Sequence, residues 1–100
     1  MKPKNKKVRC KDGFSMSVQA NFAACCSPRN DDGPYTSVEI GYPSESESLI
    51  INYAEDIDAL TDTIYGYVPV NTVYLVITKH GGMTSGQVPR GVPVYEHLKL

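Results

Sequence analysis

The chain has 100 residues, of which 41% are hydrophobic and 21% are charged. This composition is sufficient for one small buried core and too apolar for a disordered chain. No apolar run is longer than five residues, whereas a membrane span needs about 18–20. The sequence therefore argues against a transmembrane protein, a collagen-like chain and a large cofactor-dependent enzyme.

The charges are distributed unevenly, although the formal net charge is only −1. Residues 1–11 contain six basic side chains and no acidic one. Residues 30–78 contain nine acidic side chains and no Lys, Arg or His. A basic N-terminal segment is thus joined to an acidic body, and such asymmetry bears on binding partners rather than on the fold.

The cysteine content indicates a reducing environment. There are three cysteines, two of them adjacent at positions 25 and 26, whereas small secreted disulfide domains usually carry an even number. The basic N-terminus is not followed by the apolar segment of a secretory signal, because polar residues recur from Lys11 onward. We therefore expect reduced cysteines, buried as small apolar side chains, and a cytoplasmic location.

The first elements expected along the chain are strands at residues 7–10 and 14–20, which form a β-hairpin. In the second strand, apolar and polar side chains alternate with a period of two. A two-residue Asp-Gly loop would place apolar side chains on both faces. A three-residue loop with Gly13 in the left-handed conformation is favoured, because it pairs Val8 with Met16. It places six apolar side chains on one face: Val8, Cys10, Phe14, Met16, Val18 and Ala20.

The middle of the chain is expected to form a loop, a strand and a helix. A loop at residues 21–34 is rich in proline, glycine and aspartate, and a third strand follows at 35–42. Ser44 and Glu47 then have the spacing of a capping box, and apolar residues follow at helical intervals. These signals predict a helix at 45–54.

A fourth strand is expected at residues 63–68, and it is expected to pair with the third across the first helix. Alternation places Ile64, Gly66 and Val68 on one face and Tyr65 and Tyr67 on the other. The segment 71–80 has the β-branched content of a strand. Its apolar spacing and the Gly-Gly pair that follows nevertheless favour a helix. The remainder, 83–100, contains several prolines and glycines and is expected to be irregular.

This order of elements predicts an α+β fold. We expect a small antiparallel sheet, made of the hairpin plus one or two further strands, with one or two helices packed on one face. Three regions are expected: a flexible basic arm at residues 1–7, one α+β domain at 8–82, and the C-terminal tail at 83–100.

The residues that can carry chemistry lack the spacing of a catalytic or metal site. The cysteines and His80 do not have the paired spacing of structural zinc ligands. The aspartates of residues 56–62 lack the glycine and the closing glutamate of a calcium loop. A thiol nucleophile, Cys25 or Cys26 with His80 or His97, would need a local signature that the sequence lacks. We therefore expect no enzymatic activity, no metal and no cofactor.

Two binding hypotheses follow from the charge distribution. Carboxylates on an acidic face could take the place of phosphates and pair with Lys and Arg of a basic protein, although they could also serve only solubility. The expected face consists of Glu45, Glu47, Glu55, Asp56, Asp58 and Asp62. Alternatively, the arm and exposed tyrosines could bind nucleic acid, and the cations of the arm are Lys2, Lys4, Lys6, Lys7 and Arg9.

Four segments resemble a group of small bacteriophage and prophage proteins to which no activity is assigned: VRCKDGFSMSVQA (8–20), CSPRNDDGPY (26–35), VEIGYPS (38–44) and YGYVPV (65–70). The resemblance covers about residues 8–82 and provides no catalytic residue to transfer. Small phage accessory proteins commonly bind and disable a host protein, including defence systems such as CRISPR effectors.

The resemblance and the charge pattern together predict a phage-type accessory protein of the host cytoplasm. It would act by stoichiometric binding to a host protein with a basic surface. It would inhibit a defence system, as anti-CRISPR proteins do, or another nucleic-acid-binding protein. The alternative is a nucleic-acid-binding accessory protein that uses the basic arm.

Overall fold

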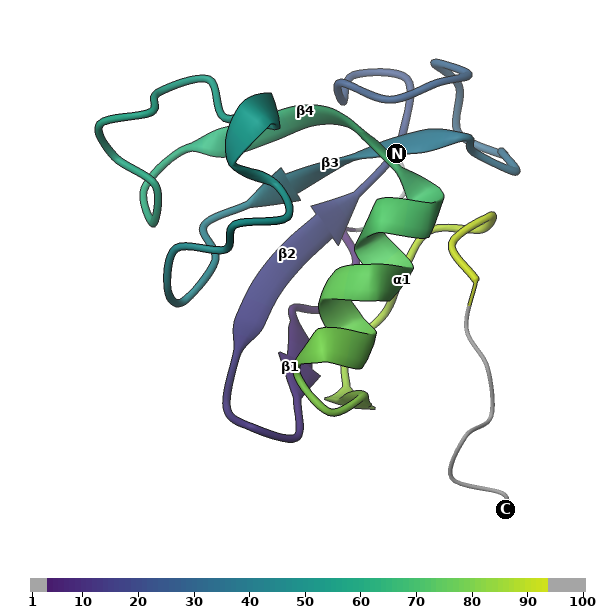
Figure 1. Cartoon of the computed structure of the whole chain (residues 1–100). Helices are drawn as coiled ribbons and strands as arrows, with labels where there is room; N and C mark the ends of the chain where they lie inside the picture. The colour runs from purple at the N-terminus through teal and green to yellow at the C-terminus, as the bar shows by residue number, and fades with distance from the viewer. Residues whose placement is uncertain (1–3, 94–100) are drawn as a thin grey trace.

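The structure is a computed structural model that describes residues 4–93. Within these residues, five strands form an antiparallel sheet in the order β4-β3-β2-β1-β5, and helix α1 packs on one face (Figure 1). This confirms the predicted α+β fold. The elements in chain order are β1 (Val8–Cys10), β2 (Ser15–Gln19), β3 (Ser37–Gly41), the 3-10 turn η1 (Ile51–Tyr53), β4 (Ile64–Pro69), α1 (Val70–Lys79) and β5 (Met83–Ser85).

The β1–β2 hairpin has the predicted three-residue loop and register. Val8 lies opposite Met16, and Gly13 has a φ of 98°. The Cys10 amide donates to the Phe14 carbonyl at 2.8 Å, which closes the loop. All six apolar side chains predicted for one face are buried. The period-two pattern was therefore sufficient to predict this register.

Helix α1 confirms the helical prediction for residues 71–80 and begins one residue earlier, directly after Pro69. Asn71 does not cap it, since Pro69 occupies the cap position and no side chain bonds there. The helix ends in a Schellman motif, in which the Gly82 amide donates to the Ile77 carbonyl at 2.9 Å. Its apolar face packs on the sheet through buried Val73, Val76 and Ile77.

The predicted helix at residues 45–54 is wrong. The segment is an irregular loop that contains only the short η1 turn. The expected capping box does not form, because the Ser44 hydroxyl accepts a hydrogen bond from the Ser15 amide at 3.0 Å. The Glu47 carboxylate points into the interior instead of back along the loop, and Ile50 is also fully buried. Tertiary contacts of the capping residues therefore override the local helical signal.

Strand β4 pairs with β3 as predicted, but its predicted facing is wrong. The register shifts between Val38 and Ile40, which lie opposite Val68 and Tyr65 respectively. This bulge places both β4 residues in the core, whereas strict alternation would put them on opposite faces. Tyr67 is exposed at the bulge with a φ of 54°.

The two predicted terminal regions are part of the domain wherever the structure describes them. Residues 83–93 contain β5, which pairs with β1, and Val92 is buried in the core. At the other end, the Asn5 amide donates to the Gln19 side-chain oxygen at 2.9 Å. Residues 1–3 and 94–100 lie outside the described residues. No helix of the described part is long and apolar enough to cross a bilayer.

Candidate protein-binding surface

An acidic loop, residues 55–62, connects η1 to β4 and is held to the sheet at both ends. The Glu55 amide donates to the Ile64 carbonyl at 3.0 Å. The buried Tyr65 hydroxyl donates to the Leu60 carbonyl. The loop therefore has a fixed position beside the edge strand β4.

Asp56 organises the interior of the acidic loop. One oxygen of its carboxylate accepts a hydrogen bond from the Asp58 amide at 2.9 Å, and its carbonyl accepts one from the Ala59 amide at 3.1 Å. The Asp62 amide then donates to the Ala59 carbonyl at 2.8 Å. These successive turns direct the acidic side chains outward and leave them exposed.

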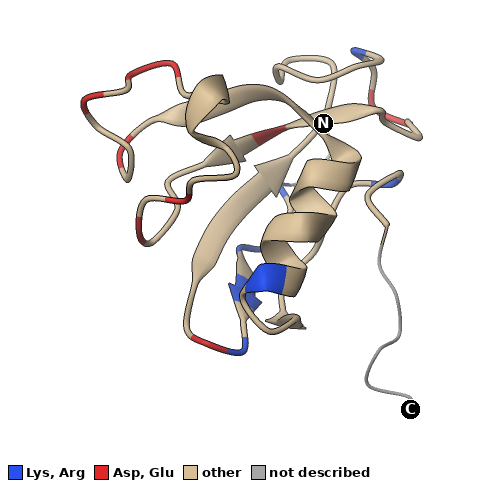
Figure 2. Cartoon of the chain, in the orientation of Figure 1, with Lys and Arg blue, Asp and Glu red and all other residues tan. Residues whose placement is uncertain are grey.

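The structure exposes five of the six residues predicted for the acidic face: Glu45, Glu55, Asp56, Asp58 and Asp62. None of the five forms an ion pair within the described residues. Figure 2 shows the acidic positions of the loops on the β4 side of the sheet. The inclusion of Glu47 in this face is wrong, because its side chain is only 1% exposed.

Two apolar side chains accompany the exposed acids. Ile57, within the acidic loop, is 64% exposed and Tyr42 is 52% exposed. The Tyr42 amide donates to the Thr63 carbonyl at 3.1 Å, which places Tyr42 beside the end of the loop. Tyr42 has a φ of 50°, and the sequence contains no signal for this conformation. We call the five exposed acids together with Tyr42 and Ile57 the acidic end.

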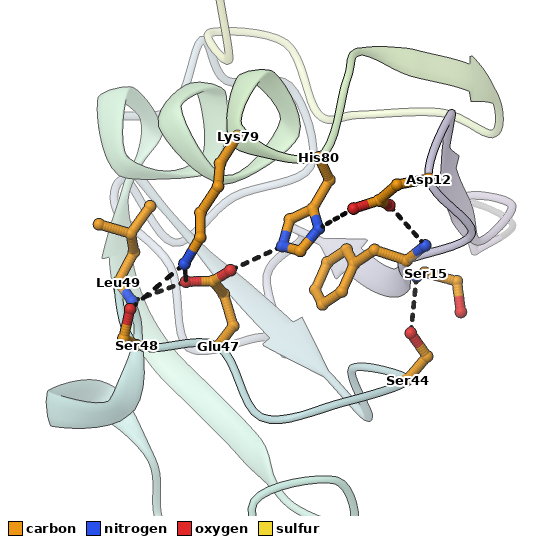
Figure 3. Close-up of polar contacts among 9 residues, drawn as sticks. Asp12, Ser15, Ser44, Glu47, Ser48, Leu49, Lys79 and His80 are labelled. Atoms are coloured by element: carbon orange, nitrogen blue, oxygen red, sulfur yellow. Dashed lines mark hydrogen bonds and ion pairs between the residues drawn. The ribbon is translucent and has the colours of Figure 1, made fainter.

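Beneath this surface, Glu47 belongs to a network of charged side chains (Figure 3). One Glu47 oxygen lies 2.6 Å from His80 Nε2, and the other lies 3.0 Å from Lys79 Nζ. The second ring nitrogen of His80 lies 2.7 Å from a carboxylate oxygen of Asp12. The Phe14 ring stacks on the imidazole with a centroid distance of 4.0 Å.

The geometry favours the charged forms of these groups. Burial of the ring disfavours its protonation, but hydrogen bonds to Asp12 and Glu47 outweigh burial and raise the pKa of His80. Burial also opposes the ionisation of Glu47, yet hydrogen bonds from the Leu49 amide and from His80 lower its pKa. The pKa of Asp12 is lowered, chiefly by the hydrogen bond from the Phe14 amide. The imidazolium therefore donates to a carboxylate on each side.

This arrangement is a structural clamp between three segments of the chain. Both ring nitrogens of His80 are engaged by carboxylates, so the ring has no nitrogen left to activate a nucleophile. The clamp joins the hairpin turn at Asp12, the loop at Glu47 and the end of α1. No sequence pattern predicts this clamp, and its only local signal is a histidine at a helix end.

The cysteines occupy three different environments. Cys10 is buried, and burial is the main reason that its pKa rises to about 11. Cys26 is buried, and its sulfur lies 3.2 Å from the Asn21 carbonyl. Cys25 is only partly buried, and burial and the nearby charge of Glu39 raise its pKa. A raised pKa disfavours the reactive thiolate. The described residues contain no group of three or more potential ligands that could hold a metal ion.

The predicted basic arm is only partly described, since Lys2 lies outside the described residues. Its other cations, Lys4, Lys6, Lys7 and Arg9, are all exposed. They lie along and before β1, on the opposite side of the sheet order from the acidic loop. The structure therefore brings the acidic and the basic candidates to separate surfaces.

Comparisons with protein-family models, with curated proteins and with solved structures gave no match. The resemblance to small phage proteins therefore stays a prediction from the sequence.

Proposed function

We propose that this chain is a small binding protein whose acidic end docks on a basic surface of a partner protein with 1:1 stoichiometry. The observation that supports the proposal most directly is the set of five exposed carboxylates without an ion-pair partner in the described part of the chain. Residues 30–78 also contain no basic side chain that could neutralise them.

The acidic end combines two features of protein interfaces. Carboxylates form strong charge-assisted hydrogen bonds with Arg and Lys, and they steer an oppositely charged partner during its approach. Tyrosine is enriched among the residues that dominate binding energy, and exposed Tyr42 lies beside the acidic loop. The acids would approach the partner's cations while Tyr42 and Ile57 exclude water between them.

The charge pattern suggests the class of partner. A surface that presents carboxylates in an ordered loop can occupy a groove that normally binds phosphates. We therefore propose a host nucleic-acid-binding protein as the target. This agrees with the phage-type inhibitor, including the anti-CRISPR-like inhibitor, predicted from the sequence resemblance.

The test compares the wild-type protein with a variant in which Glu45, Glu55, Asp58 and Asp62 are replaced by Gln or Asn. Asp56 is kept, because its carboxylate organises the loop. Each protein is used to capture partners from a bacterial lysate, and the partner's affinity is then measured by titration at two salt concentrations. We expect a basic protein bound at 1:1, with affinity at least tenfold lower for the variant.

A matched pair of single variants serves as the control. Asp58→Asn and Asp32→Asn change the charge equally at exposed positions, but only Asp58 belongs to the acidic end. Asp58→Asn should weaken binding and Asp32→Asn should not. Equal affinity of the fourfold variant and the wild-type protein for the captured partner would refute the proposal. Capture of no basic protein by the wild type would refute it as well.

A further inference from the structure

We propose that the outer face of β1 binds single-stranded nucleic acid through its phosphates. The binding surface is a basic row formed by Lys7, Arg9 and Lys11. This inference goes beyond the proposed function, because it concerns a different surface and a different class of partner.

The row follows from the alternation of side chains along β1. Val8 and Cys10 are buried, so Arg9, which lies between them in β1, points to the other face of the sheet. Lys7 and Lys11 directly flank the strand, and all three cations are exposed. Alternate residues of a strand lie about 6.7 Å apart, so the row is about 13 Å long.

The backbone that carries the row is ordered. Strand β1 pairs with β2 on one side and with β5 on the other, and Arg9 lies opposite Ser15 and Ser85. The Lys11 amide donates to the Gly82 carbonyl at 3.0 Å, which extends the pairing beyond the strand. The cations are therefore held in a fixed row and do not belong to a flexible arm, which lowers the entropy cost of binding.

The charges of the row are available to a ligand. No side chain of the row forms a hydrogen bond or an ion pair within the described residues. The acidic residue nearest in sequence is Asp12, whose carboxylate is paired with the His80 imidazolium. The clamp thus offsets the negative charge of Asp12, which would otherwise weaken the positive potential at this hairpin.

The other acidic residues are distant by the geometry of the sheet. Three strand spacings separate β1 from β4, which amounts to about 14 Å, and the acidic loop lies beyond β4. Glu39 on β3 is about two spacings away, or 10 Å, and accepts a hydrogen bond from the Cys25 amide. Glu45 is at a similar distance, because the preceding residue, Ser44, is hydrogen-bonded to Ser15 of β2. The Debye length at physiological salt is about 8 Å. Repulsion of a phosphate chain by these acids is therefore weakened at physiological salt, and it acts over a longer range at 25 mM salt, where the Debye length is about 20 Å.

The shape of the row favours a single strand over a duplex. The row consists of a three-residue strand and the residues that flank it, whereas a duplex strand winds around its axis once in about 34–36 Å. A flexible single strand can adjust the positions of its phosphates to three closely spaced cations. Strand β1 carries no aromatic side chain for base stacking, so binding should be independent of sequence. Three phosphate contacts to a single strand predict a salt slope of about −2.

The test is fluorescence anisotropy with a labelled 20-nucleotide oligothymidine at salt concentrations from 25 to 150 mM. We expect the wild-type protein to bind at low salt. We expect the triple variant Lys7→Gln, Arg9→Gln, Lys11→Gln to lose at least tenfold in affinity and most of the salt slope. Circular dichroism verifies that the variant is folded.

Arg9→Gln and Arg90→Gln form the matched control, since both remove one exposed arginine and only Arg9 belongs to the row. Arg9→Gln should lower the affinity severalfold and Arg90→Gln less than twofold. No binding by the wild type at 25 mM salt, or equal losses in the two variants, would overturn the proposal. Tighter binding of a 20-base-pair duplex would overturn the assignment to single strands.

The outcome can be separated from that of the proposed function. The fourfold acidic variant should bind the oligonucleotide at least as tightly as the wild type, because it removes residual repulsion. A basic partner protein, in contrast, should bind that variant more weakly. Either proposal can therefore fail while the other stands.

Discussion

At the scale of single residues, the central feature is a buried charged histidine between two carboxylates. Removing charges from water costs several kcal/mol per ion (~3 or more), and close pairing must offset this cost. In this protein His80 and Glu47 are both buried, and they lie 2.6 Å apart. Loss of one partner leaves the other charge buried and unpaired, so the two residues depend on each other.

We expect Glu47→Gln to lower the free energy of unfolding by about 3 kcal/mol, because it breaks a buried ion pair. Chemical denaturation measures the change. Asp12→Asn is the control, since Asp12 also pairs with His80 but its side chain is 50% exposed. Its effect should be much smaller, because water can take the place of the lost charge. Equal effects of the two variants would show that burial does not govern this network.

The clamp also predicts how stability depends on pH. The folded-state pKa of His80 is raised, so its contribution is complete below about pH 6.5 and is lost as the pH rises through the folded value. The pKa values of Glu47 and Asp12 are lowered. Their contribution is present above about pH 4.5 and is lost as the pH falls through the folded values.

Melting temperatures measured between pH 3 and 8 should therefore be highest between about pH 4.5 and 6.5. The decline on the alkaline side should be absent in His80→Gln, which has no group that titrates at this position. A decline of the same size in wild type and variant would assign it to other groups.

At the scale of elements, glycines allow the C-terminal segment to lie close to the rest of the chain. A Cβ atom at Gly86 would lie 2.3 Å from the Lys7 carbonyl oxygen. A Cβ atom at Gly91 would lie 2.3 Å from the Tyr35 carbonyl oxygen. Because real atoms cannot approach so closely, the segment that follows β5 can pack on the domain only with glycine at these positions.

Gly13→Ala and Gly86→Ala separate backbone conformation from steric clash. Both glycines have positive φ values, 98° and 107°, so each substitution should cost about 1–2 kcal/mol for conformation. A Cβ atom at Gly13 would meet no atom within 4 Å, so Gly86→Ala should destabilise more. Denaturation gives the difference, and hydrogen exchange at Gln87, whose amide donates to the Lys6 carbonyl, should be faster only in Gly86→Ala.

At the scale of the whole molecule, the small net charge conceals two surfaces of opposite sign. The clamp holds two positive and two negative side chains and is neutral in total. The acids of the acidic end and the cations around β1 take no part in the clamp, so their charges can act on partners. The separation of the two surfaces follows from the sheet order, in which β1 and β4 are three positions apart.

The fourfold acidic variant should keep its stability, because substitutions of exposed residues usually change it by no more than about 0.5 kcal/mol each. Its melting temperature should remain within about 10 °C of the wild-type value, and its circular dichroism spectrum at room temperature should be unchanged. Unfolding of this variant at room temperature would show that the acids have structural roles and would remove it as a probe of binding.

The sequence alone determined the features that depend on neighbours along the chain. Alternation over residues 14–20 and Gly13 were sufficient for the hairpin register, because only one register puts all the apolar side chains on one face. The Gly-Gly pair after His80 was sufficient for the end of α1, because glycine readily adopts the positive φ that a Schellman motif needs. The exposure of most of the acidic face also followed from local polarity.

Only the tertiary structure decided the features that depend on contacts between distant residues. His80 meets Glu47 across 33 positions and Asp12 across 68, and no local pattern encodes such a meeting. Because of these contacts, the Glu47 side chain neither forms the expected capping box nor lies on the acidic face. Strand β5 was missed because a three-residue segment has too few side chains to show a period and forms only when β1 supplies its hydrogen bonds.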